Sequence, residues 1–242
     1  MPFFTKCLLL CRLGFYWVSW FTSMPNSFIV NDAALIYGEN ELWRLILSPL
    51  LVTSFWFDLT IVMPFWLCFF CYVREFQRGT ATSLLYFNLI NIALQLTSLP
   101  LAYLASQILS ETTYADILSK ECAFFNIFVV DLYQAMLANP NKPIDLLFCT
   151  VPQKYFALIV LFFANIVLPY DYVSILAVLI VGTTLHLTRN VDLLNPTIAK
   201  VERAVGCGRT CNMGSIGYIT ADEGKQNATS CTDHYVPFNR KQ

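Results

Sequence analysis

The chain has 242 residues, of which 57% are hydrophobic and only 13% are charged, with a formal net charge of −1. Soluble domains carry roughly 25% charged residues, so a lipid bilayer is the solvent that suits this composition. The near-neutral charge provides no basic field for nucleic acid, which argues against a nucleic-acid partner. The 20 phenylalanines suit contacts with acyl chains and with membrane interfaces.

Six apolar stretches predict an all-α membrane protein with six transmembrane helices. A helix rises about 1.5 Å per residue, so crossing a bilayer core of ~30 Å takes about 20 residues. Residues 6–21 could form a signal peptide, but Arg12 interrupts the apolar part and no small-residue cleavage site follows, so we expect a membrane helix. Pro169 separates the last two stretches, which we interpret as two helices rather than one kinked helix. The predicted spans are 6–21, 50–72, 82–105, 123–137, 154–168 and 170–187.

Basic residues are distributed unevenly between the loops that join these spans. The N-terminus, the turn at 74–79, the loop at 139–153 and the C-terminal tail together hold about twelve of the Lys and Arg residues. The loops on the other side hold only Arg44 and Lys120, beside seven acidic residues. The positive-inside tendency therefore predicts that both termini lie on the cytoplasmic or matrix side.

The tail differs in composition from the rest of the chain. From residue 191 it is rich in Gly, Asn, Thr and charges of both signs. It has too few apolar residues for a substantial core of its own. We therefore divide the chain into a transmembrane domain at 1–190 and a short, irregular polar extension at 191–242, which we expect to lie on a partner or on the membrane surface.

Two motifs flank the second span. Residues 41–50 read E-L-W-R-L-I-L-S-P-L, with Trp43 and Arg44 before the span, and residues 74–79 read R-E-F-Q-R-G, with Glu75, Arg78 and Gly79 after it. An indole ring and a guanidinium suit a membrane boundary, so interfacial anchoring alone is one interpretation of the first motif. We expect Glu75 to pair with a neighbouring arginine and Gly79 to end a helix or to permit a close helix contact.

The spacing of these motifs resembles the rhomboid superfamily, in particular its derlin-like and other inactive branches. In derlins a Pro-x-x-Thr-Arg/Lys segment precedes the first helix, and residues 2–6 are similar. The resemblance extends over about residues 2–187 and implies a six-helix rhomboid-like bundle.

The residues that make rhomboids proteases are missing. The resemblance implies a Gly-x-Ser-Gly turn at the start of the fourth helix, where this chain reads E-C-A-F-F-N-I-F at 121–128. In the sixth helix Gly182 matches the glycine before the catalytic histidine, but Thr183 stands in place of that histidine. A cysteine protease that uses Cys122 and His186 is a remote alternative. We expect a protein that is not an enzyme.

Several polar residues fall inside the predicted spans. Asp58 and Asp131 are costly there unless they are hydrogen-bonded, and they could alternatively form a proton relay or a hydrophilic groove. Asn88, Asn91 and Gln95 share one face of the third helix. This face could bind helices together or could line a wet cavity.

The tail holds three thiols and an imidazole in two groups, at Cys207 and Cys211 and at Cys231 and His234. Four such groups could bind zinc, although a disulfide and free thiols are alternatives. Asn227-Ala228-Thr229 is a glycosylation sequon. The predicted topology leaves it unmodified.

These features predict a non-catalytic accessory subunit of a large membrane complex, with the mitochondrial respiratory chain or ATP synthase as the leading setting. The expected partners are membrane lipids and other subunits, with a bound phospholipid rather than a cofactor. The alternative is a derlin-like factor in protein quality control at the endoplasmic reticulum. The tail carries no motif that we recognise for recruiting an ATPase or ubiquitin, which weakens this alternative.

Overall fold

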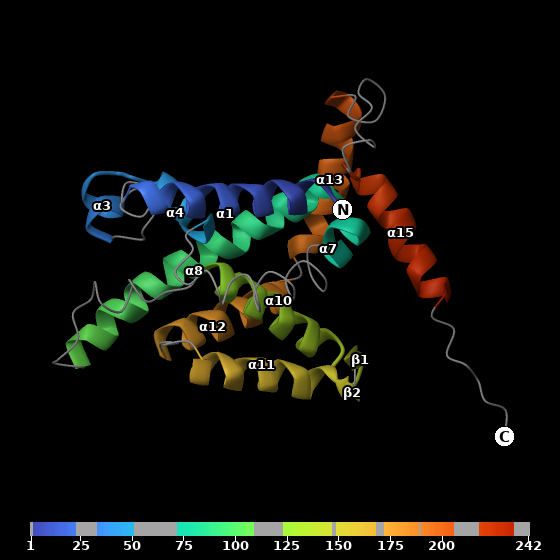
Figure 1. Ribbon diagram of the computed structural model, residues 1–242. Coiled ribbons are helices and arrows are strands. Elements are labelled where there is room, and N and C mark those ends of the chain that lie inside the picture. Colours follow the sequence, from blue (N-terminus) through green and yellow to red (C-terminus); the bar gives the residue numbers. More distant parts are fainter. Residues whose placement is uncertain are drawn as a thin grey trace. The chain divides into compact units, whose positions relative to one another are not determined.

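The computed structural model describes residues 2–22, 33–50, 72–108, 123–146, 149–167, 172–188, 190–205 and 218–234 (Figure 1). Most of the described residues are helical, which confirms the all-α class. The helices are α1 (Phe3–Phe21), α3 (Ala33–Gly38), α4 (Trp43–Leu47), the 3-10 helix η1 (Ser48–Leu50), α7 (Tyr72–Arg78), α8 (Thr80–Ile108), α10 (Ala123–Ala138), α11 (Gln153–Val167), α12 (Tyr172–Thr188), α13 (Asn190–Val205) and α15 (Ala221–His234).

Helices occupy five of the six predicted spans, and the remaining span, 50–72, lies almost entirely outside the described residues. Among the described helices, α8 is the one that is long and apolar enough to cross a membrane. Residues Phe124–Ala138 and Tyr172–Thr188 are apolar helices of shorter length.

The chain divides into two compact units. The first contains residues 2–11, 72–86, 190–205 and 218–234 of the described chain, and the second contains the other described residues. The division falls within two helices, since α1 and α8 each begin in the first unit and continue in the second.

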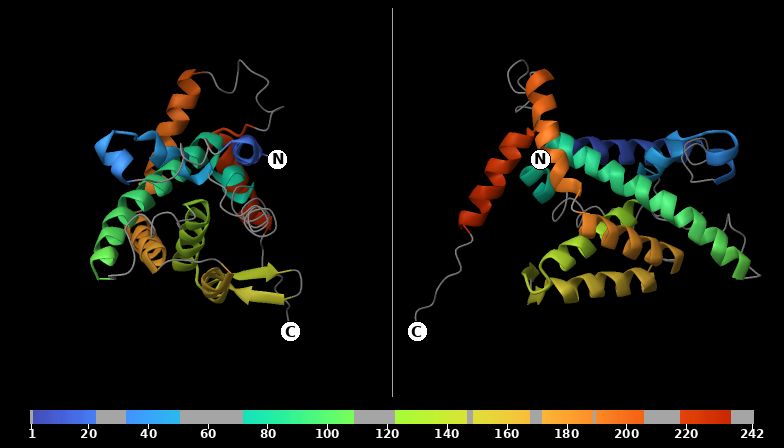
Figure 2. Two further views of the ribbon diagram at one scale, coloured as in Figure 1. Left: turned by 60° about the vertical axis from the view of Figure 1, so that its left-hand side comes forward. Right: turned by 180° about the vertical axis from the view of Figure 1, so that it is seen from behind.

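The core of the second unit is α10, whose side chains from Phe124 to Leu132 are all buried. Helices α11 and α12 pack beside it (Figure 2). At Gly182 of α12 a Cβ atom would lie 2.6 Å from Cδ1 of the Tyr133 ring on α10, so the absence of a side chain allows this close contact. A further cluster joins Leu99 and Ala102 of α8 to Val173 of α12.

The loop predicted at 139–153 contains a feature that the all-α prediction did not include. Strands β1 (Pro143–Leu146) and β2 (Cys149–Pro152) form an antiparallel hairpin, with Pro143 opposite Pro152 and Leu146 opposite Cys149. The two strands lie directly before α11 in Figure 2.

The prediction of an irregular tail is wrong for the described residues. Residues 190–205 and 221–234 form α13 and α15. Helix α13 buries Ile198, Ala199 and Glu202, which are spaced as one face of a helix. Ile198 and Ala199 form a small core with Ala221 and, more peripherally, with Ala81. The tail thus folds by packing on the first unit, not by forming a core alone.

Candidate functional site

The central side chain of the first unit is that of Glu75, the fourth residue of α7, and it is fully buried. Its carboxylate accepts four hydrogen bonds. The amides of Phe4 and Thr5 donate over 2.8 and 3.0 Å, and the hydroxyls of Thr5 and Thr80 donate over 2.8 Å each. An ionised carboxylate has about four acceptor positions, so Glu75 is fully satisfied.

The two amides belong to the first turn of α1. Such amides have no partner inside their own helix, and the helix dipole favours negative charge at this end. Glu75 therefore acts as an N-terminal cap supplied by another helix. Among the described side chains, the carboxylate makes these four bonds and no ion pair with Arg78, whereas the side chain of Arg74 lies outside the description. The guanidinium of Arg78 lies over the ring of Tyr86, 5.2 Å from its centroid.

Thr80 joins this cap to the tail. Its amide donates to the carbonyl of Ile219 over 2.7 Å, and its hydroxyl accepts from the amide of Ile219 over 2.9 Å. Because the same hydroxyl donates to Glu75, one side chain contacts both the cap of α1 and the segment that leads into α15.

Two glycines let the backbones of α7 and α15 approach closely. Gly79 has a φ of +89°, and a Cβ there would lie 2.8 Å from backbone atoms of Thr220 and Ala221. A Cβ on Gly224 would lie 2.6 Å from the amide nitrogen of Gly79. Beside this contact, the side-chain amide of Asn227 donates to the carbonyl of Phe76 over 3.1 Å. Gly79 therefore ends α7 and also admits a close helix contact.

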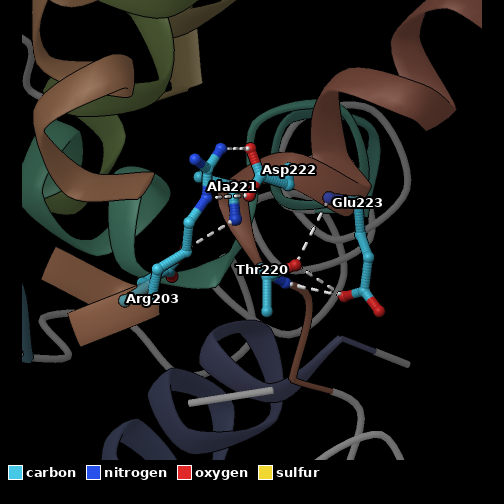
Figure 3. Close-up of polar contacts among 6 residues, drawn as sticks. Arg203, Thr220, Ala221, Asp222 and Glu223 are labelled. Atoms are coloured by element: carbon cyan, nitrogen blue, oxygen red, sulfur yellow. Dashed lines mark hydrogen bonds and ion pairs between the residues drawn. The ribbon is translucent and has the colours of Figure 1, made fainter. Parts of the chain in front are cut away.

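A second buried carboxylate, Glu202 on α13, caps α15 in the same way. It accepts from the amide of Ala221 and from the hydroxyl of Tyr218, each over 2.8 Å. Thr220 and Glu223 form a capping box at the same helix end (Figure 3). The amide of Thr220 donates to Glu223 over 2.9 Å, and the amide of Glu223 donates back to the Thr220 hydroxyl over 3.3 Å.

An exposed ion pair closes the contact between α13 and α15. The guanidinium of Arg203 donates two hydrogen bonds of 2.8 Å to the carboxylate of Asp222 (Figure 3). These bonds lower the pKa of Asp222 and raise the pKa of Arg203. These contacts form one polar network in the first unit. It consists of Glu75, Thr80, Glu202 and the segment 218–223.

The second unit has a separate polar cluster. Asn91 and Gln95 of α8 are both fully buried. The side-chain amide of Asn91 donates to the carbonyl of Leu45, and that of Gln95 donates to the Ser48 hydroxyl over 3.0 Å. These side chains tie α8 to the segment of α4 and η1.

Arg12 is a buried cation that the sequence interpretation treated only as an interruption. Its guanidinium lies 3.9 Å from the centroid of the Phe124 ring and donates to the carbonyl of Pro49. It is 1% exposed. The charge is thus accommodated by an aromatic face and a carbonyl within the second unit.

The remaining predicted residues are dispersed. Trp43 is exposed at the start of α4, whereas Arg44 is buried and pairs with Glu41 over 2.5 Å. Asp131 is buried on α10, and Asn88 is half-buried on α8.

Of the four residues predicted as a zinc site, Cys207 and Cys211 lie outside the described residues. The predicted intramembrane Asp58 also lies outside them. Cys231 and His234 belong to the last turn of α15. In the part of the chain that the structure describes, no group of three or more His, Cys, Asp or Glu side chains could hold a metal ion.

Comparisons with family models, with curated proteins and with solved structures found no match. The rhomboid-like resemblance therefore stays a prediction from the sequence motifs.

Sequence reasoning identified Glu75 and Gly79 but missed Thr80, Glu202 and the pair of Arg203 and Asp222. One signal was available: Thr-Ala-Asp-Glu at 220–223 has the spacing of a capping box and announces a helix start. The role of Glu202 has no comparable local signal, because its partners are 16 and 19 residues away.

Proposed function

We propose that this protein is a non-catalytic, multi-pass membrane protein that serves as a structural accessory subunit of a large membrane complex. The observation that carries the proposal is the use of Glu75. It is the most deeply buried acidic group described, and all of its acceptor positions are engaged in joining α1, α7 and α8. A carboxylate that is saturated in this way holds elements together and has no acceptor position left for a substrate.

The apolar surfaces support a membrane setting. Helix α8 is long and apolar enough to cross a bilayer, and Leu84, Leu85, Leu96 and Leu104 are exposed along it. The end of α1 exposes Trp17, Trp20 and Phe21, each by about two thirds or more of its surface. Indole rings favour the boundary between acyl chains and headgroups, so these residues suit a bilayer interface.

The tail supports a role in assembly. The exposed residues of α13 and α15 include the charged Lys200, Arg203, Glu223 and Lys225 beside the apolar Val201. Glu202 of α13 caps α15, and close glycine contacts hold α15 against α7. A polar element held in one conformation is a suitable surface for a neighbouring subunit, because little conformational entropy is lost on binding. We propose the mitochondrial inner membrane as the compartment, since its energy-transducing complexes contain many such additional subunits.

Purification of the native protein in a mild detergent, followed by native-gel migration and mass spectrometry, tests the proposal. We expect migration at fixed stoichiometry with subunits of the respiratory chain or of ATP synthase. Migration with a ubiquitin ligase and an ATPase would instead establish the derlin-like role at the endoplasmic reticulum. Migration as a single chain would refute the accessory-subunit proposal.

A further inference from the structure

We propose that the Thr80 hydroxyl couples the two ends of the chain, so that seating of α1 on Glu75 and docking of the tail at Ile219 stabilise one another. This inference goes beyond the accessory role and does not depend on it. It rests on contacts within the first unit.

The Thr80 hydroxyl donates one hydrogen bond and accepts another. A hydroxyl has one hydrogen to donate, and the hydroxyl of Thr80 donates it to Oε1 of Glu75 over 2.8 Å. Its lone pairs then accept from the amide of Ile219 over 2.9 Å. Donation to a carboxylate polarises the hydroxyl and makes its oxygen a better acceptor. The bond to the tail is therefore strongest when the Glu75 carboxylate is fixed in place.

The Glu75 carboxylate is fixed by α1. Its Oε2 accepts from both the amide and the hydroxyl of Thr5, and its Oε1 accepts from the amide of Phe4. At the other end, Ile219 is two residues from Ala221, whose amide is held by Glu202. A chain of hydrogen bonds thus runs from the first turn of α1 through one hydroxyl to Ile219, two residues before the start of α15.

Coupling between two binding events is reciprocal. If a seated α1 favours tail docking, a docked tail must favour a seated α1 by the same factor. The consequence for the protein is cooperative stability: neither end of the first unit reaches its full stability until the other end is in place.

Hydrogen exchange on the full-length protein in detergent tests the coupling, because the amides of Phe4, Thr5, Ile219 and Ala221 report the two ends separately. Thr5→Val removes one hydroxyl that donates to Glu75. We expect the amides of Ile219 and Ala221 to exchange roughly five-fold faster in this variant, the order expected for the net effect of one hydrogen bond. Conversely, Glu202→Gln should accelerate the amides of Phe4 and Thr5 by a similar factor.

Removal of the link should abolish these distant effects. In a Thr80→Val background, Thr5→Val should leave the Ile219 and Ala221 amides unchanged, whereas a Thr80→Ser background keeps the hydroxyl and should keep the response. Thr80→Ala provides a second background without the hydroxyl. Thr97→Val is the matched control, because its hydroxyl donates to the Ala93 carbonyl within the same helix, α8.

The amides of α10 give the reference for global loosening and should not change in any variant. The inference is overturned if Thr5→Val leaves tail exchange at the wild-type rate, or if α10 accelerates equally. It is also overturned if the effect of Thr5→Val on the tail persists in full without the Thr80 hydroxyl.

Discussion

At the scale of residues, Glu75 and Glu202 perform the same task at two different helix ends. Each carboxylate is buried, and each accepts amide hydrogen bonds from the first turn of a helix to which it does not belong. Buried charge is costly unless it is fully hydrogen-bonded, and helix amides are costly unless they are capped. In each arrangement the same hydrogen bonds satisfy the buried carboxylate and cap the helix amides.

We expect Glu75→Gln to lower the free energy of unfolding by roughly 2 kcal/mol, because the new NH₂ group would face donors instead of accepting from them. The measurement is thermal or denaturant unfolding of the detergent-solubilised protein. Glu39→Gln is the matched control, since Glu39 is exposed and its loss should matter by less than about 0.5 kcal/mol. Equal stability of the two variants would contradict the role assigned to Glu75.

The exposed pair of Arg203 and Asp222 predicts a pH effect with a definite sign. Its hydrogen bonds to Arg203 hold the pKa of Asp222 below the ordinary value of 3.8. The contribution of Asp222 to tail docking is therefore fully present above that ordinary value and is lost as the pH falls through the lowered pKa. In Arg203→Gln we expect the pKa of Asp222 to rise towards 3.8, measured by NMR titration of the labelled carboxyl carbon. An unchanged pKa would show that the pair does not form in solution.

At the scale of elements, backbone proximity decides how α15 meets α7. The contact depends on two positions without side chains, Gly79 and Gly224, and one of them has a left-handed backbone. A residue with a Cβ would be strained at that φ and would also overlap the backbone of Thr220. The fit between the helices is therefore sensitive to single-atom changes.

Gly79→Ala should undock α15 and expose it to proteases. Strain and overlap together should cost at least about 1–3 kcal/mol, so tryptic cleavage after Lys225 should accelerate roughly ten-fold or more. Gly38→Ala is the control, because a Cβ there meets nothing within 4 Å and the backbone does not require glycine. A cleavage rate of Gly79→Ala equal to that of Gly38→Ala would rule out the close contact.

The helices that sequence reasoning located were those with long apolar runs, because burial in lipid or in a core imposes a composition visible over 15 or more residues. Helix α8 and the cores of α10 and α12 belong to this class. Helices α13 and α15 were missed because their stability comes from caps and from packing on α7 and α8. Gly79 was predicted to permit a close contact, but its partner was 145 residues away in the sequence and could not be deduced.

At the scale of the whole molecule, the proposed topology with six spans places both termini on one side of the membrane. The sequon at Asn227 would then lie away from the glycosylation machinery. The structure adds a second obstacle, because the side-chain nitrogen of Asn227 that would carry a glycan already donates to the Phe76 carbonyl over 3.1 Å. Both considerations predict an unmodified Asn227.

A microsomal insertion assay tests the topology. We expect no glycan on Asn227. Leu42→Thr creates an Asn-Glu-Thr sequon at the exposed Asn40, which should be glycosylated because Asn40 lies between the first two predicted spans, on the side opposite both termini. The mass increment on a gel, removed by a glycosidase, is the readout. Modification of Asn227, or failure to modify the new sequon at Asn40, would contradict the predicted orientation.

The way in which Glu75 recognises α1 has a consequence for natural variation. Two of the four hydrogen bonds to the carboxylate come from backbone amides at the start of α1, which every residue except proline supplies whatever its side chain. Orthologous chains should therefore be able to exchange Phe4 for other apolar residues while they retain the acid at position 75 and the glycines at 79 and 224. Drift at the start of the chain and constancy at these three positions would be the evolutionary signature of recognition through the main chain.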